Sequence, residues 1–191
     1  PVLIAVRVED SIPLNRDLGL DVERWLDEDL VDLVSASHYF RMVPWSEMAT
    51  LCAKHDVPFY ACLAESRVRE IDGRTRAPLR NTIESYRARA ANAYRAGASG
   101  IELYNLFDPT HPAFRELGDP AALAGRNKIY FASVRGSGGA HWRVPNAHRY
   151  RRTPVLSPER VLHGPIPLSA TPVSVRVEVG DESGAGRPPR V

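Results

Sequence analysis

Four short apolar runs constrain the fold of this 191-residue chain, because each ends in polar residues and is followed by a helical pattern. The runs occupy residues 2–8, 31–37, 57–63 and 100–106. Strands that are apolar on both faces and alternate with amphipathic helices are typical of a parallel sheet covered by helices. The carboxyl ends of such strands share one edge of the sheet, where active sites gather. The sequence therefore predicts an α/β fold and the edge at which a site would lie.

The segments between these runs carry helical signals. Apolar spacing predicts helices around 20–28, 45–55 and 81–96, and a short helical piece near 120–124. Asp21 is the expected N-cap of the first helix, and Gly97 the expected stop of the third.

A four-stranded parallel sheet fits either a small doubly wound domain or half of an eight-stranded barrel. No Gly-rich phosphate loop follows any of the runs, although such a loop is typical of doubly wound nucleotide-binding domains. All four runs end in polar residues, as expected when every strand contributes to one mouth. We therefore expect half of a TIM (β/α)8 barrel over residues 1–135.

The pattern changes after Arg135. A stretch rich in Pro, Arg and His has no helical period, and residues 173–179 then alternate with valine at every second position. This period is the signature of a half-buried strand. We expect residues 136–191 to contain a linker and the start of a truncated β-sandwich, and the whole chain to be an excerpt of a longer protein.

Composition narrows the classes of partner. The formal net charge of +2 is too small to indicate nucleic acid. No apolar run approaches the roughly 20 residues of a membrane-spanning helix. Cys52 and Cys62 lack the spacing of a zinc or redox site, so we expect core thiols, although a disulfide stays open. No cofactor is expected, and the cellular location stays open.

Three segments carry a family resemblance. RVEDSIPLNRDLGLDVERWLDEDLVDLVSASHYF, ACLAESR and AYRAGASGIELYNLFD resemble the C-terminal half of glycosyl-hydrolase-like barrels, and are most similar to the family called glycosyl hydrolase-like 10. The resemblance covers roughly residues 2–135. It implies that the four runs are strands five to eight of a barrel whose first four strands are missing here, and that a β-sandwich follows.

The same resemblance suggests a catalytic residue. Glycoside hydrolysis uses two carboxyl groups, and in barrel glycosidases the acid usually follows strand four and the nucleophile strand seven. Glu65 follows the counterpart of strand seven, which makes it the candidate nucleophile or charge stabiliser, with Ser66 and Arg67 keeping it ionised. A purely structural ion pair between Glu65 and Arg67 stays open.

Arg7 lies inside the first run, where an unpaired charge is costly. We therefore expect it to meet a carboxylate inside the barrel, and Glu102, in the middle of the fourth run, is the candidate. Contact between Arg7 and a substrate is the alternative. Glu9 and Asp10 end the first run, and because adjacent side chains point to opposite sides, at most one faces the mouth.

Aromatic and polar residues at the other strand ends suit a sugar, whose faces stack on rings and whose hydroxyls form hydrogen bonds. We expect a substrate groove lined by Arg7, Tyr39, Arg67, Tyr104, Asn105 and Asp108. The two tyrosines also fit ordinary core positions. A metal site is a weaker alternative, with the candidate ligands Asp10, His38, Asp108 and His111.

The sequence thus predicts a glycoside hydrolase-like fragment that acts on a carbohydrate, with its second carboxylate and the N-terminal half of its barrel lying upstream. A glycan-binding barrel without catalysis is the alternative, and a metal-dependent barrel hydrolase is the third hypothesis. A half-barrel leaves two strand edges unpaired, so we expect the isolated chain to self-associate.

Overall fold

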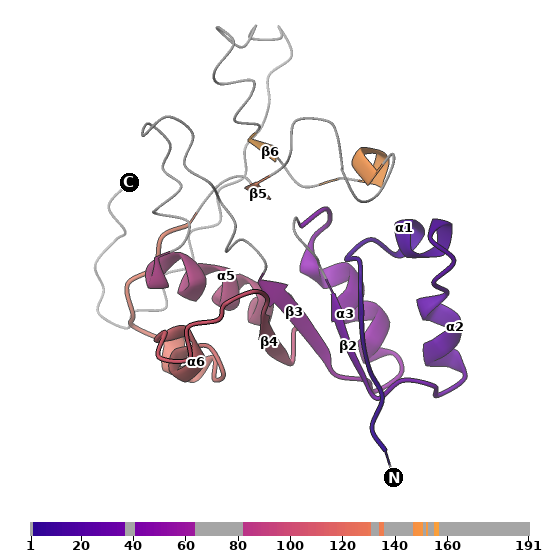
Figure 1. Ribbon diagram of the computed structural model, residues 1–191, viewed down its shortest axis with the longest axis horizontal. Coiled ribbons are helices and arrows are strands. Elements are labelled where there is room, and N and C mark those ends of the chain that lie inside the picture. The colour runs from indigo at the N-terminus through magenta and orange to yellow at the C-terminus, as the bar shows by residue number, and fades with distance from the viewer. Residues whose placement is uncertain are drawn as a thin grey trace, which may run out of the picture.

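The computed structural model describes residues 2–36, 41–63, 82–130, 134–135, 147–150, 152 and 155–156. Its centre is a sheet of four parallel strands in the order β1-β2-β3-β4 (Figure 1). The strands are β1 (Ala5–Val8), β2 (Leu33–Ala36), β3 (Phe59–Leu63) and β4 (Gly100–Leu103). Neighbours in the chain are neighbours in the sheet, so the sheet contains no reversal of strand order. The predicted α/β fold of four parallel strands alternating with helices is confirmed.

Helices connect consecutive strands. The described helices are α1 (Ile12–Asp17), α2 (Val22–Asp27), α3 (Trp45–Ala53), α5 (Ile83–Arg95) and α6 (Ala113–Glu116), with 3-10 turns η2 (Ala121–Leu123) and η3 (Ala147–Tyr150). The sequence pattern located α2, α3, α5 and η2. It missed α1, where Ile12 and Leu14 lie two positions apart rather than at helical spacing, and α6, which has only four residues.

Local capping explains where the helices begin and end. The predicted N-cap Asp21 accepts a hydrogen bond from the Arg24 amide at 3.2 Å. Thr82 caps α5 by accepting one from the Ser85 amide at 3.4 Å. After α5 the chain turns at Gly97, whose φ of 99° is strained for residues with a side chain.

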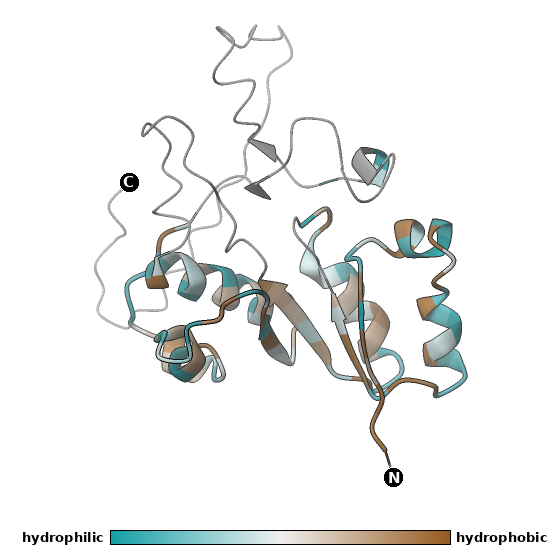
Figure 2. Ribbon diagram, viewed as in Figure 1, coloured by the Kyte–Doolittle hydropathy of each residue, from teal (hydrophilic) through white to brown (hydrophobic). Residues whose placement is uncertain are grey.

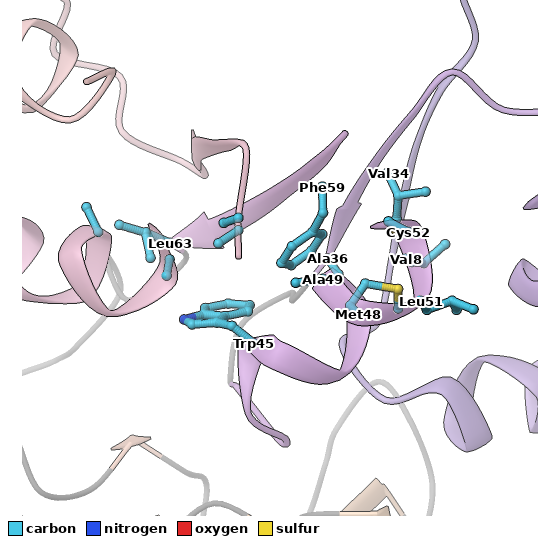
Figure 3. Packing of buried hydrophobic residues seen from close by; sticks show 14 of the residues in the cluster. Val8, Val34, Ala36, Trp45, Met48, Ala49, Leu51, Cys52, Phe59 and Leu63 are labelled. Atoms are coloured by element: carbon cyan, nitrogen blue, oxygen red, sulfur yellow. The ribbon is translucent and has the colours of Figure 1, made fainter. Parts of the chain in front are cut away.

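One face of the sheet forms the apolar core. Figure 3 shows Phe59 and Leu63 of β3 and Trp45 of α3 in this layer. The Trp45 and Phe59 rings lie 6.2 Å apart at a tilt of 48°. Buried side chains of α2, α3, α5 and α6 all join this cluster. Figure 2 shows the result as largely apolar strands beside helices of mixed character.

Side chains on alternate strand positions point to the opposite face. The register pairs Arg7 with Ser35, Ser35 with Tyr60, and Cys62 with Glu102, which places all five residues on this second face. The second face is therefore much more polar than the core face.

Within the described residues there is no β-sandwich. The only strands after β4 in that part of the chain are β5 (Val134–Arg135) and β6 (Val155–Leu156), which pair in parallel. The expected strand at 173–179 lies outside the described residues. In the described sheet β1 and β4 are the outer strands, and Val2 and Leu3 before β1 are 90% and 78% exposed.

None of the helices in the described ranges combines the length and the hydropathy that a membrane crossing demands.

Replacing Phe59 by alanine should lower the free energy of unfolding by about 3–5 kcal/mol, because the ring is 1% exposed at the centre of the core and its removal leaves a cavity. Phe107→Ala is the matched control, since Phe107 is 83% exposed, and should change the stability by less than about 0.5 kcal/mol. Urea unfolding measures both; equal effects would contradict the core assignment.

Candidate functional site

The polar face of the sheet is organised around the Glu102 carboxylate. Arg7 donates from Nη1 to Glu102 Oε1 at 3.3 Å, and the Ser35 hydroxyl donates to Glu102 Oε2. The expected meeting of Arg7 with Glu102 is confirmed. Ser35 was not identified from the sequence, because a serine in a buried strand carries no signal until the register places it beside an acid.

This contact joins the two outer strands of the sheet. In a flat sheet β1 and β4 would lie three strand spacings apart, or about 14 Å. Side chains that stand perpendicular to a flat sheet would not meet over that distance. The contact between Arg7 and Glu102 therefore indicates that the sheet curves toward its polar face.

Tyr104 completes the cluster just beyond the end of β4. The Arg7 guanidinium carbon lies 4.2 Å from the centroid of its ring, within the range of a cation–π contact. The Arg7 and Glu102 side chains remain 38% and 31% exposed in the described sheet, so a ligand on this face would reach both. Arginine, carboxylate and hydroxyl together offer donors and acceptors around one aromatic ring.

Arg7 and Glu102 bring opposite charges to the cluster. Burial lowers the pKa of Arg7, but Glu102, Cys62 and Tyr104 together outweigh burial and raise the pKa above its usual value. Burial and the Glu102 carboxylate raise the pKa of the Cys62 thiol well above its ordinary range. Among the described residues, this face therefore carries the Arg7 guanidinium, the Glu102 carboxylate paired with it and a neutral Cys62 thiol, and the Glu9 carboxylate raises the pKa of that thiol further.

Tyr60 and Gly100 are partners on the same face, at the start of β4. A Cβ atom added at Gly100 would lie 2.7 Å from Tyr60 Cζ, so the tyrosine ring occupies the space that any larger residue would need. Glycine at the start of β4 is thus required by close approach of a side chain from the neighbouring strand.

Asn105 and Asp108 follow β4, as the sequence predicted. Asn105 has a left-handed φ of 57°, a conformation that asparagine tolerates better than most residues. Asp108 accepts hydrogen bonds from the amide and the hydroxyl of Thr110 at 2.9 and 2.6 Å, which lower its pKa. Its carboxylate thus stabilises its own turn.

The remaining predicted site residues lie outside the described part of the chain. They are Glu65 with its neighbours Ser66 and Arg67, and His38 and Tyr39. Their roles stay predictions. Among the described residues, no three His, Cys, Asp or Glu side chains come together as a metal site, so the grouping of Asp10, Asp108 and His111 has no support there.

The sequence offered Asp10 only as a candidate metal ligand and did not predict that its carboxylate is buried. It is 1% exposed and accepts hydrogen bonds from the Met42 and Val43 amides at 2.6 and 3.1 Å. Burial raises its pKa to about 7, although the two amides and Arg41 oppose the shift. An Asp–Glu pair at the end of a strand resembles any polar strand end, and only packing shows which carboxylate is buried.

Comparison with known proteins found no family model that matches this chain and no match among curated proteins.

A double-mutant cycle with Arg7→Met and Glu102→Gln should give a coupling energy of about 0.5–1 kcal/mol, because both side chains keep about a third of their exposure. Urea unfolding at low and at 1 M salt measures it, and the coupling should shrink with salt. The surface pair Arg24–Glu28 is the control, expected near 0.3–0.5 kcal/mol. Zero coupling would show that the pair does not organise this face.

Proposed function

We propose that the described sheet is half of a (β/α)8 barrel and that its polar face lines the barrel interior. Three observations support this. The strands follow one another in chain order without reversal, and the buried faces of the helices lie on one side. Arg7 of one outer strand contacts Glu102 of the other over the opposite side. A barrel interior filled by side chains from successive strands has this arrangement.

In this proposal the polar face is covered by the first four strands of the barrel. They would pair with the open edges of β1 and β4 and cover the polar face. The chain would obtain them from the N-terminal half of its own barrel, as the family resemblance implies.

The function that we infer is the hydrolysis of a carbohydrate at the carboxyl ends of the strands. The observation that carries it is the Arg7–Glu102–Tyr104 cluster, which presents donors, acceptors and an aromatic ring at that end of the sheet. Sugars need this combination, because their hydroxyls form hydrogen bonds while their ring faces stack on aromatic side chains. Asn105 follows at the same end.

Glu65 is the proposed nucleophile or charge stabiliser. It comes two residues after Leu63, the last residue of β3, and β3 lies between β2 and β4 in the sheet. The second carboxylate that glycoside hydrolysis needs would come from the missing half. Arg67 and Tyr39 join the proposed substrate contacts on the same argument from the strand ends.

One observation favours a second candidate, a glycan-binding barrel without catalysis. Both oxygens of Glu102 are engaged, one by Arg7 and the other by Ser35. A carboxylate held in this way binds and positions, and is poorly placed to attack a sugar. If Glu65 has no carboxylate partner, the cluster would serve recognition alone.

In the complete protein that contains this chain, Glu65→Gln should reduce release of reducing sugar from its polysaccharide by about 10²–10⁴-fold while binding persists, because the amide keeps the shape and removes the charge. Glu28→Gln, an exposed change at the C-cap of α2, is the control and should leave hydrolysis unchanged.

Reducing-sugar assays and calorimetry over a panel of polysaccharides separate the outcomes. Hydrolysis unchanged in Glu65→Gln would remove Glu65 from the mechanism. Binding by the wild type without any product would select the glycan-binding function. Loss of activity on adding a chelator would select the metal-dependent hydrolase.

A further inference from the structure

A carboxylate with an unusual environment lies directly after β1. The Asp10 side chain is 1% exposed, and its Oδ2 atom accepts the amides of Met42 and Val43 at 2.6 and 3.1 Å. Its Oδ1 atom is also buried and has no hydrogen-bond partner among the residues that the structure describes. An ionised carboxylate in such a place loses its hydration and regains only part of it from the protein, which is costly.

The backbone beside Asp10 is fixed from the side of α1. Asn15, fully buried, accepts the Glu9 amide at 2.9 Å and donates from Nδ2 to the Glu9 carbonyl at 2.7 Å. This pair of hydrogen bonds holds the end of β1 in one conformation. Asp10 therefore has little freedom to reach water by itself, and relief must come from the segment that covers it.

That segment is held from its other side by residues from far along the chain. We call Ala147–Tyr150 and Arg152 the strap; Figure 1 shows its helical turn, in orange, on the α1 side of the sheet. The Arg152 amide donates to the Met42 carbonyl at 2.7 Å. Tyr150 packs on the small cluster of Leu14, Met42 and Val43.

Two side-chain contacts complete the attachment of the strap. The Tyr150 hydroxyl donates to Asp17 of α1, and the Arg152 guanidinium pairs with Glu47 of α3. The peptide at Met42 and Val43 is therefore bound by Asp10 from within and by the strap from outside. Movement of this peptide away from Asp10 would disturb both.

We propose that Asp10 is a proton-operated latch, which holds Met42, Val43 and the strap closed when protonated and releases them when it ionises. Within the described part of the chain, two charged groups influence its ionisation. Glu9 on its own strand disfavours ionisation, and Arg41 on the covering segment favours it. Burial is the largest influence and sets the direction.

The direction follows from the two states of Asp10. In the closed state burial raises its pKa to about 7, whereas in water the ordinary value of 3.8 applies. The closed state therefore binds the proton more tightly between these limits. Closure is fully favoured below about pH 4 and is lost as the pH rises through 7. Between pH 5 and pH 8 the open fraction should rise by as much as about 100-fold.

Amide hydrogen exchange resolved by residue tests the latch in the whole chain. After correction for the intrinsic rate, the protection factors of the Met42, Val43 and Arg152 amides should fall together by about 10- to 100-fold between pH 5 and pH 8. In Asp10→Asn, which keeps an acceptor and cannot ionise, the three factors should be independent of pH. Protection that stays constant in the wild type would overturn the proposal.

Asp32→Asn is the matched control. Asp32 also accepts a backbone amide, that of Ile4 at 2.7 Å, but it is exposed. This variant should keep the full pH dependence of the wild type. If Asp32→Asn abolished that dependence as Asp10→Asn does, the effect would belong to general charge and the latch would be refuted.

A direct titration keeps the proposal testable if Asp10→Asn fails to fold. The side-chain carboxyl carbon of Asp10 in the wild type, followed by NMR, should titrate with a midpoint near neutrality, and the Arg152 amide signal should move over the same range. A midpoint near 4, or an Arg152 amide that does not respond, would contradict the latch.

Discussion

The packing of β3 against α3 and α5 is the interaction on which the rest of the structure depends. Phe59 lies 1% exposed beside Trp45, and fully burying one such side chain contributes about 1.5–3 kcal/mol. Because strand side chains alternate, fixing Phe59 toward the helices commits Tyr60 and Cys62 to the opposite face. A slip of β3 by one residue would turn Tyr60 and Cys62 toward the helices and Phe59 toward the polar face. The apolar layer thus decides where the polar cluster lies.

On the polar face, Arg7 and Glu102 form an ion pair that crosses the sheet. Arg7 and Glu102 come from the two outer strands, and Ser35 of the strand beside β1 supplies the second contact to the carboxylate. Such a pair contributes little to stability while it is partly exposed, yet an unpaired charge in its place would be costly once the face is covered. Stability alone therefore does not explain the cluster.

At the end of β1, a rigid backbone carries a buried carboxylate whose ionisation is costly. Asn15 fixes the backbone of Glu9, while Asp10 carries a carboxylate whose pKa burial raises to about 7. The buried carboxylate holds the segment that precedes α3, and the strap reaches the same segment from residues more than a hundred positions later. One peptide thus connects the strand end, the next helix and a distant part of the chain. A group that is costly when ionised is well placed to make such a connection depend on pH.

The sequence by itself determined the four parallel strands, the helices that show an apolar repeat, and the need of Arg7 for an acidic partner, because periodicity and the cost of a buried charge are local properties. It left α1 and α6 unseen, since the apolar residues of α1 are not at helical spacing and α6 has only four residues. The roles of Ser35 and Gly100 and the burial of Asp10 were decided only by tertiary structure. Register sets which residue faces which across neighbouring strands, and packing decides which of two adjacent acids loses its water. Both depend on contacts between residues far apart in the chain.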